Sequence, residues 1–326
     1  MMNSWIAIAV LAGLASALIF AAAGVPTIAA AAVFLLAPAP LLIVGLGWGF
    51  LVALIGGLIG AVALALLIGW AFAVPYLLST VLPAVIICRL ALKRRPAPPV
   101  GGTEGEVRSG DVEWYPEGRV LIAIALMAGI LASALVIMAG PDAQSFRAST
   151  DQLLDRVLIL QNVTPSPEQK QRLQSMRSLF ANLLPAAAAI GWTLSTFANF
   201  RLAETIAARL RITARPLPRF GTLAFPRLAA LGLLVAAASA LLPDSFGLIG
   251  GAFAGGLAAA FALLGLAVLH GLLEGHPLRP MLLVALYVAV LVLGFALALP
   301  LIVTGLLDML FAMRARTRRS QSGGSV

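Results

Sequence analysis

The sequence has very few charged residues. Only 11% of its 326 residues are charged, whereas 61% are hydrophobic, and no charged residue precedes Arg89. A soluble domain carries about 25% charged residues, so a soluble fold of this composition would have too little polar surface to face water. The scarcity of charge therefore excludes an ordinary soluble protein and indicates a protein of the lipid bilayer.

The long apolar runs predict transmembrane helices. A helix needs about 20 apolar residues to cross about 30 Å of hydrocarbon at 1.5 Å per residue. The runs are continuous and do not alternate, which favours helices over a β-barrel. We predict an all-α, polytopic transmembrane helical bundle of about eight to ten spans. The expected spans are about 4–23, 28–46, 49–68, 70–91, 120–140, 184–200, 228–242, 247–270 and 281–299, with a short returning helix after a break at Pro300.

The opening block allows two arrangements. Residues 1–91 are long enough for four spans, and their first charged residue is Arg89. Pro38 and Pro40 interrupt the second apolar run, and each lacks a backbone donor, so a broken helix is expected there. Three spans with a re-entrant piece is the alternative.

The polar segments divide the rest of the chain. Residues 92–119 form a Pro- and Gly-rich linker that we expect to be a flexible loop, closed by the Pro116-Glu117 pair typical of a helix start. Residues 120–319 form a second membrane block, and residues 320–326 a disordered tail. Within this block, residues 141–180 are expected to be an extracytoplasmic loop with two short amphipathic helices. These helices are Asp151 to Leu160 and one that begins with the capping-box pattern Ser166-Pro167-Glu168-Gln169.

The net charge of +9 comes from basic residues that lie just outside the apolar runs. This distribution follows membrane topology and argues against nucleic acid as a partner. The linkers after spans four, six and eight, together with the tail, carry 17 of the 22 Lys and Arg residues. We therefore predict a multi-pass protein of the bacterial inner membrane with a cytoplasmic C-terminus. The N-terminus is cytoplasmic with four opening spans and outside with three, and the first 20 residues form a span rather than a cleaved signal.

Residues and motifs for catalysis are missing. Cys88 is the only cysteine, which excludes an intramolecular disulfide and a cysteine metal cluster. The sequence contains no Walker loop, Gly-x-Ser-x-Gly motif or His-Glu-x-x-His motif. No span carries a ladder of ionisable residues of the kind found in proton-coupled pumps. We predict that the chain is not an enzyme and has no catalytic, cofactor or metal site.

A few polar residues remain as candidates. Asp308 lies inside the last apolar run, six residues before Arg314, and either has a function in the membrane or faces headgroups or Arg314 at the interface. His270 and Glu274 share a helical face, with His276 near them. They could hold a metal or relay a proton, but no third ligand is visible, so an interfacial position is favoured.

Two further features of the spans concern packing. Asn199, Arg201 and Glu204 cluster at the inner end of the sixth span, where the last two form an i,i+3 pair that we interpret as structural. Small residues recur every four positions, which allows another helix to approach closely. Such rows serve either as docking faces for a partner subunit or, as we favour, for internal packing. The rows are Ala9, Gly13, Ala17 and Ala21; Gly56 and Gly60; Gly247, Gly251 and Gly255; and Ala252, Gly256 and Ala260.

Several segments resemble the YybS-like family of bacterial inner-membrane proteins, whose function is unknown. They are Leu36-Ala37-Pro38-Ala39-Pro40, Gly45-Leu46-Gly47-Trp48-Gly49, Trp114-Tyr115-Pro116-Glu117-Gly118 and the closing Gly305 to Arg314. That family is distantly similar to the substrate-binding S components of energy-coupling-factor transporters. The resemblance implies that the small-residue face of the first span is similar to the alanine-rich face by which S components dock on a coupling protein. The present chain differs in having more spans and a long outer loop.

Two hypotheses about function follow. The first is a small-molecule transport subunit without its own ATPase, which would need a coupling protein at its basic cytoplasmic face. The alternative is a structural or assembly factor of the cell envelope that binds an envelope protein through its extracytoplasmic loop. Both require the lipid bilayer and, apart from it, a protein partner.

Overall fold

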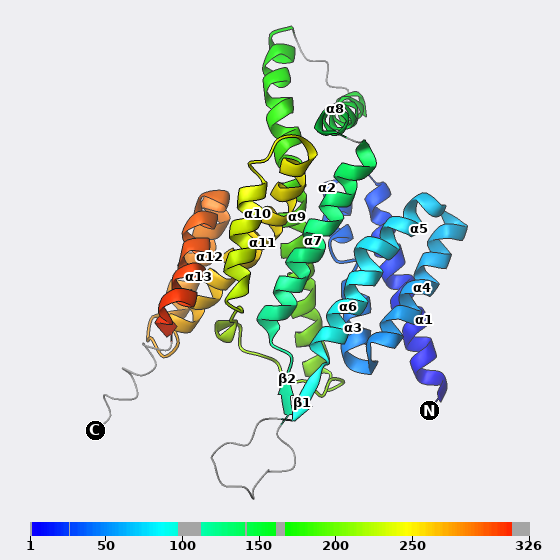
Figure 1. The fold of residues 1–326 in the computed structure, drawn as a ribbon. Coiled ribbons are helices and arrows are strands. Elements are labelled where there is room, and N and C mark those ends of the chain that lie inside the picture. Colours follow the sequence, from blue (N-terminus) through cyan, green and yellow to red (C-terminus); the bar gives the residue numbers. More distant parts are fainter. Residues whose placement is uncertain (1, 26, 97–111, 141, 161–166, 315–326) are drawn as a thin grey trace, which may run out of the picture. The chain divides into compact units, whose positions relative to one another are not determined.

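In the computed structural model the protein is a helical membrane protein (Figure 1). It describes residues 2–25, 27–96, 112–140, 142–160 and 167–314, without the side chains of 2–4, 157–160, 167–175 and 295. Within these ranges seven helices are long and apolar enough to cross a membrane, and three apolar helices are shorter. The predicted all-α polytopic class is confirmed. The predicted tail, Ser166 of the capping box and residues 97–111 of the linker lie outside the described residues.

The helices form two compact units. Unit 1 comprises Met1–Ala123 and Ser195–Arg219, and unit 2 comprises Ile124–Leu194 and Phe220–Val326. The boundaries fall inside two helices, α7 (Glu117–Ala139) and α9 (Pro167–Arg209). This division differs from the expected blocks 1–91, 92–119 and 120–319, because the last part of α9 packs with the N-terminal elements.

Unit 1 begins with four spans. The first is α1 (Met2–Ala21), the second is split into α2 (Ile28–Phe34) and α3 (Ala39–Trp48), and the third is α4 (Phe50–Leu67). The fourth consists of α5 (Trp70–Tyr76), a π-helix (Leu77–Val81) and α6 (Leu82–Ala91). Four of the seven candidate spans therefore begin before Arg89, which lies in the last turn of α6. The expected break separates α2 from α3 at Pro38, and Pro40 lies in the first turn of α3.

The small-residue row of the first span packs inside unit 1. Ala9 and Ala17 are buried, and Gly13 lies against Gly56 of α4. A Cβ atom on Gly56 would come within 2.6 Å of the Ala9 carbonyl oxygen, so the two helices approach as closely as glycine allows. Only Ala21, at the end of the row, stays half-buried. In unit 1 this face therefore packs against α4.

The linker between the fourth and fifth spans contains a short hairpin. Strand β1 (Arg94–Pro96) pairs with β2 (Val112–Trp114) in antiparallel register, with Arg94 opposite Trp114 and Arg95 opposite Glu113. The expectation of a flexible loop is wrong for these ends of the linker. The Arg95–Glu113 ion pair across the strands, at 2.8 Å, is one physical reason for the pairing.

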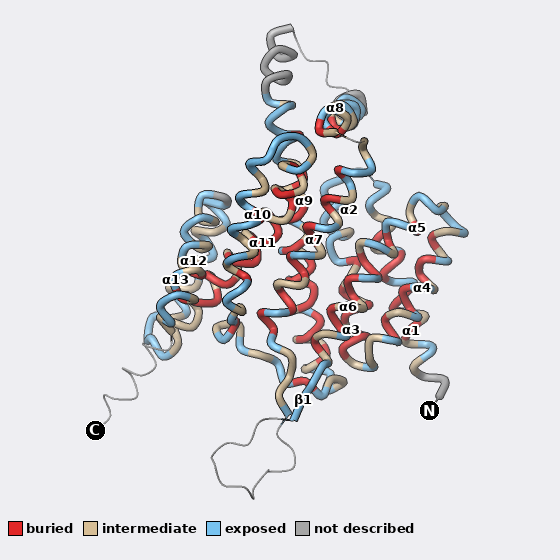
Figure 2. Tube along the Cα trace, in the orientation of Figure 1, coloured by how far each residue is buried: buried red, intermediate tan, exposed pale blue. Residues whose placement is uncertain are grey.

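In unit 2, α11 (Asp244–Leu272) contacts α8 (Ala143–Leu160), α10 (Leu228–Ser239) and α13 (Ala298–Phe311). Buried residues, red in Figure 2, follow much of its length. A Cβ atom on Gly255 would lie 2.9 Å from Ala186 Cα in α9, and one on Gly256 would lie 2.6 Å from the Ala125 oxygen in α7. Gly247 packs against the turn before α11, whereas Gly251 has open space. In the row Gly247, Gly251 and Gly255, the first and third glycines therefore pack against other parts of unit 2, and Gly251 does not.

The last apolar run breaks earlier than expected. It forms α12 (Arg279–Leu293), a 3-10 turn (Gly294–Leu297) and α13. Gly294 takes a positive φ of 48°, which ends α12, and Pro300 lies in the first turn of α13. The predicted break at Pro300 is wrong, because a first-turn proline lacks only an N–H that has no helical partner there.

The polar loop is more helical than the sequence indicates. Helix α8 begins at Ala143 instead of Asp151, and Asp142 caps it by accepting a hydrogen bond from the Ser145 N–H at 2.7 Å. That backbone hydrogen bond lowers the pKa of Asp142 below its ordinary value. The Ala143 N–H donates to Asp244 Oδ1 at 2.6 Å, which fixes α8 to the start of α11. The second expected helix begins at Pro167 and continues without a break as α9.

The close approach of α1 and α4 can be tested by adding bulk. Gly56→Leu should lower the thermal stability of the purified protein in detergent, because a side chain at this position has no space and overpacking costs about 1–3 kcal/mol or more. Gly251→Leu is the matched control, since nothing lies near its Cβ position. Equal melting temperatures for the two variants would contradict the packing described.

Candidate functional site

The second span of unit 1 is unwound between α2 and α3. The turn covers residues 35–38, where Pro38 lacks an N–H, and Ala39 N–H donates to the Leu36 oxygen at 3.0 Å. The carbonyl oxygens of Leu35 and Ala37 are therefore not bonded within a regular helix. In a membrane such groups must be bonded by protein or must line a water-filled cavity. This turn is the main irregularity of the described N-terminal spans.

Polar side chains from two other helices bond the unwound turn. Asn199 Nδ2 of α9 donates to the Leu35 oxygen at 2.7 Å, and Ser195 Oγ donates to the same atom at 3.1 Å. Ser16 Oγ of α1 donates to the Ala37 oxygen at 2.6 Å. Ser16 is fully buried, and Asn199 is 3% exposed. Three distant parts of the sequence thus meet at one break in a helix.

Four buried polar atoms of unit 1 make no hydrogen bond of ordinary geometry within the described part of the chain: the Tyr76 hydroxyl, Asn199 Oδ1, Glu204 Oε1 and Arg215 Nε. The Tyr76 hydroxyl and Asn199 Oδ1 belong to residues near the unwound turn, and the Tyr76 hydroxyl interacts with the Ser16 side chain. Tyr76 is fully buried and follows Pro75 at the start of the π-helix, a distortion that often occurs at functional sites. Phe20 packs edge-on against its ring, with 5.2 Å between the ring centroids. Buried polar atoms without partners need an explanation, such as a bound ligand or water.

A largely buried group of four charged side chains lies near the C-terminal end of α9. Arg201 Nη1 donates to Glu117 Oε1 at 2.6 Å and to Glu204 Oε2 at 2.9 Å. Arg215 Nε lies 3.7 Å from Glu204 Oε1. Glu117, Glu204 and Arg215 are 7%, 4% and 6% exposed. Two acids and two bases make the group neutral, so each charge has a compensating neighbour.

Arg215 also fastens the segment after α9 to the rest of unit 1. Its guanidinium donates to the Ala91 oxygen at 2.9 Å and to the Tyr115 oxygen at 3.3 Å. A cavity of about 10 Å³ beside Glu204 and Arg215 is large enough for about one water molecule. The group therefore joins the ends of α6 and β2 to the chain after α9. Its role is structural, and sequence analysis found only its Arg201–Glu204 pair.

Asp308 faces Arg314. The carboxylate of Asp308 accepts hydrogen bonds from Arg314 Nη2 at 2.7 Å, from Nε at 2.9 Å and from its backbone N–H at 3.0 Å. Ala312, with φ of 50°, reverses the chain at the end of α13 and brings Arg314 back to the helix. Arg314 Nη1 also donates to the Gly221 oxygen at 2.7 Å. Of the two alternatives open from the sequence, the pairing with Arg314 is the one observed.

Both ring nitrogens of His270 have hydrogen-bond partners within the chain. Its Nδ1 lies 2.9 Å from the Leu266 oxygen, to which it donates, and its Nε2 lies 3.2 Å from the Tyr287 hydroxyl. Phe220 packs edge-on against the imidazole. His276 instead accepts from the Leu278 N–H at 3.1 Å. Within the described residues no group of three or more His, Cys, Asp or Glu side chains that could hold a metal ion is found.

Most of the residues at the unwound turn were not among the candidates from the sequence. The break and Asn199 were expected from the sequence, whereas Ser16 and Tyr76 were not. A signal was present, because each is a polar residue within an apolar span. The sequence could not show that the turn between α2 and α3 is where Ser16 and Asn199 meet.

Comparisons with known proteins identify a family. The family model described as Predicted membrane protein (DUF2232) matches residues 13–309. No curated protein and no solved structure matches the sequence.

Arg201 should be essential for the stability of unit 1. Arg201→Met leaves two buried carboxylates without their shared cation and should reduce the free energy of unfolding by about 3–5 kcal/mol. Denaturant titration in mixed micelles measures the change. Arg209→Met on the same helix is the control, because Arg209 is exposed. A loss of the same size in both variants would show that the buried group contributes nothing specific.

The contributions of Asp308 and Arg314 to the stability of the protein should be coupled. Asp308→Asn leaves the Arg314 guanidinium without its counter-charge and should destabilise the protein by about 3 kcal/mol. The double variant Asp308→Asn/Arg314→Gln should recover part of this loss, because no unpaired charge remains. Thermal unfolding in detergent compares the unchanged protein, Asp308→Asn, Arg314→Gln and the double variant, and strictly additive effects would rule out the coupling.

Proposed function

The chain belongs to this family of membrane proteins, and from that premise we propose that it is a small-molecule transport subunit without an ATPase of its own. The observation that carries the proposal is the unwound turn between α2 and α3. Transporters bind substrates near the middle of the membrane at discontinuous helices, where backbone groups and polar side chains are available. Here the Leu35 and Ala37 carbonyls meet polar side chains of α1 and α9 at such a break.

The chemistry of unit 1 favours a neutral polar ligand. The first four spans carry no charged residue before Arg89, so a charged ligand there would have no counter-charge. The Tyr76 hydroxyl, which interacts with the Ser16 side chain, and Asn199 Oδ1 are buried polar groups that make no hydrogen bond of ordinary geometry within the described chain. A ligand that bonds to either group would satisfy a polar atom whose burial is otherwise costly.

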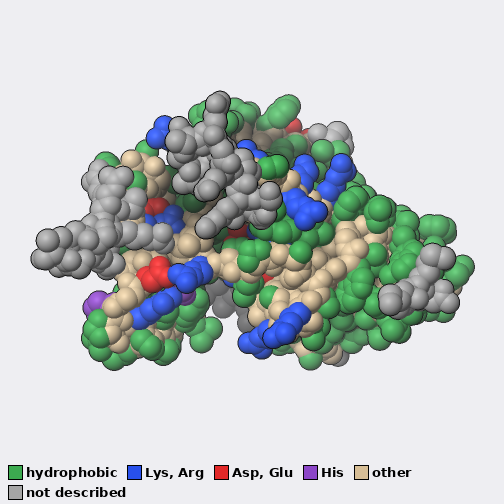
Figure 3. All heavy atoms as spheres, turned by 90° about the horizontal axis from the view of Figure 1, so that it is seen from below, with side chains coloured by type: hydrophobic (Ala, Val, Ile, Leu, Met, Phe, Trp, Pro, Cys, Tyr) green, Lys and Arg blue, Asp and Glu red, His purple; other side chains and the backbone are tan. Residues whose placement is uncertain are grey.

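A transport role requires a coupling partner and a defined orientation. The protein is not an enzyme in this proposal, because its sequence has no Walker loop and cannot hydrolyse ATP by itself. Most Lys and Arg residues lie in the linkers and tail that we place on the cytoplasmic side of a bacterial inner membrane, together with the C-terminus. In Figure 3, Lys and Arg side chains are visible among hydrophobic ones on the face viewed from below. A coupling protein would dock there, and not on the row that α4 covers.

The ordered outer helix α8 supports a second candidate, an assembly factor of the cell envelope. Helix α8 is fixed at its start by Asp244, and Arg147 Nε donates to Asn182 of α9 at 3.0 Å. An ion pair between Asp155 and Arg177 adds a second connection between the two helices. Leu153 of α8 is 58% exposed on this fixed element. A helix held in this way could present a surface to an envelope protein.

Purification of the full chain in mild detergent, followed by native mass spectrometry, tests the transport proposal. We expect a co-purified small molecule or a coupling ATPase. Tyr76→Phe should weaken binding of that molecule by about tenfold, since a buried hydrogen bond contributes about 1 kcal/mol or somewhat more. Tyr287→Phe in unit 2 is the matched control and should bind as the unchanged protein does.

The same experiment separates the two candidates. Absence of both a bound small molecule and a coupling subunit would count against transport. Capture of an envelope protein that is lost when residues 150–177 are deleted, with an otherwise folded bundle, would favour the assembly factor. An unchanged set of partners after that deletion would reject the second candidate.

A further inference from the structure

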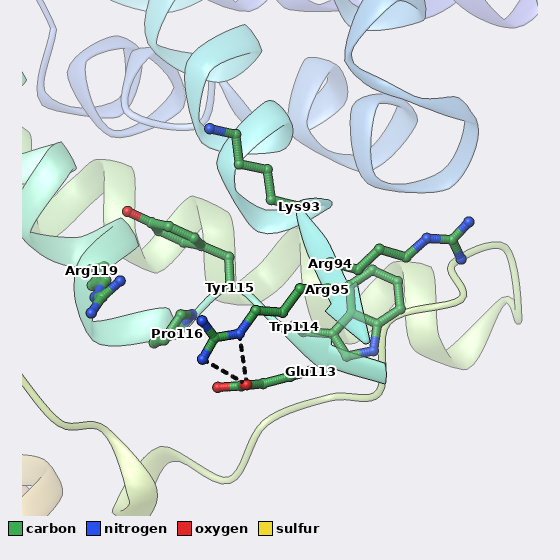
Figure 4. Close-up of a pocket in the computed structure, with 8 residues that line it drawn as sticks. All are labelled: Lys93, Arg94, Arg95, Glu113, Trp114, Tyr115, Pro116 and Arg119. Atoms are coloured by element: carbon green, nitrogen blue, oxygen red, sulfur yellow. Dashed lines mark hydrogen bonds and ion pairs between the residues drawn. The ribbon is translucent and has the colours of Figure 1, made fainter. Parts of the chain in front are cut away.

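An open pocket lies at the hairpin, where the fourth span ends and the fifth begins (Figure 4). Its volume is about 230 Å³. The chain that forms it is fixed by backbone hydrogen bonds, since Tyr115 N–H donates to the Lys93 oxygen at 2.9 Å. The pocket is lined by Lys93, Arg94, Arg95, Glu113, Trp114, Tyr115, Pro116 and Arg119.

The lining has an excess of positive charge. Four of the lining residues are cationic and one is acidic. Arg95 forms an ion pair with Glu113 at 2.8 Å, and this hydrogen bond lowers the pKa of the Glu113 carboxyl. Lys93 and Arg94 are exposed, and no ion pair of either within 4 Å is found in the described chain. Arg119 is also exposed and interacts with Glu113 only through longer-range attraction. The lining therefore carries three more positive than negative charges.

The position of the pocket places these cations at the membrane surface. Lys93 follows the span that ends at Ala91, and Arg119 lies in the first turn of the span that begins at Glu117. Trp114 and Tyr115 stand between them, and such aromatic side chains prefer the level of the lipid headgroups. The Arg119 guanidinium lies 6.0 Å from the centre of the Tyr115 ring, and in Figure 4 the Arg94 side chain extends past Trp114.

We propose that this pocket binds the phosphate of an anionic phospholipid headgroup. The cations offer hydrogen-bond donors that match phosphate oxygens, and arginine does so with a planar pair of N–H groups. A lipid is favoured over a soluble phosphate compound because the pocket adjoins two spans at headgroup level, where a lipid phosphate is already concentrated. The site does not depend on the transport function, and either candidate function is compatible with it.

Lipid titration of the full-length protein tests the site. Phosphatidylglycerol and phosphatidylcholine are added separately to the detergent-solubilised chain, and bound lipid is measured by native mass spectrometry. Phosphatidylglycerol should bind and phosphatidylcholine should not. Lys93→Gln/Arg94→Gln/Arg119→Gln should weaken phosphatidylglycerol binding about a hundredfold, given the usual contribution of each cation at an anionic membrane surface.

A matched variant controls for general charge. Arg209→Gln/Arg211→Gln/Arg227→Gln also removes three exposed arginines and should bind phosphatidylglycerol as the unchanged protein does. If the triple pocket variant does not fold, Lys93→Gln alone should weaken binding about fivefold.

Three outcomes would overturn the proposal. Equal binding of the two lipids would show that the headgroup charge is not recognised. Equal losses in the pocket variant and the control variant would show general attraction to a basic surface. Displacement of the lipid by millimolar inorganic phosphate or glycerol 3-phosphate, which then bind without lipid, would assign the pocket to a soluble phosphate compound.

Discussion

A backbone carbonyl inside a membrane must find a hydrogen-bond donor, and this requirement organises unit 1. Pro38 interrupts the second span and leaves the Leu35 and Ala37 oxygens outside a regular helix. The lipid offers no donor, so leaving them unbonded would cost several kcal/mol each. The side chains of Ser16 and Asn199 supply the donors, which brings α1 and α9 to the turn.

Close helix packing makes these contacts possible. Lipid is as apolar as the side chains, so helices in a membrane associate by surface fit and polar contacts rather than by exclusion of water. Gly13 and Gly56 allow α1 and α4 to approach at their backbones, and Gly255 and Gly256 do the same for α11. Most positions of these rows are therefore in contact within the chain, and Gly251 is the exception.

The charged residues are gathered where the chain leaves the membrane. The neutral group around Arg201 holds the ends of several elements together, and the Asp308–Arg314 pair closes the end of α13. The basic pocket at the hairpin differs from both, because its lining has four cations and one carboxylate, and Lys93, Arg94 and Arg119 are exposed. This excess of positive charge is the basis of the proposed anion site.

Composition and local pattern were enough to predict the helical membrane class, most of the spans and the break at Pro38. These properties depend on near neighbours in the sequence, since span length follows from hydrocarbon thickness and a proline removes a donor wherever it stands. The end of α12 was misplaced because glycine at a positive φ ends the helix before Pro300 is reached.

The partners of the polar residues were decided only by the tertiary structure. Asn199 bonds to Leu35, and Arg215 bonds to Ala91 and Tyr115, across separations that no local pattern records. The sequence itself determined that Asn199 is a polar residue of an apolar span and that Arg215 belongs to a basic linker. Folding determined which backbone group or charge each of them meets, because a buried polar atom is stable only beside a suitable partner that the packing of distant helices supplies.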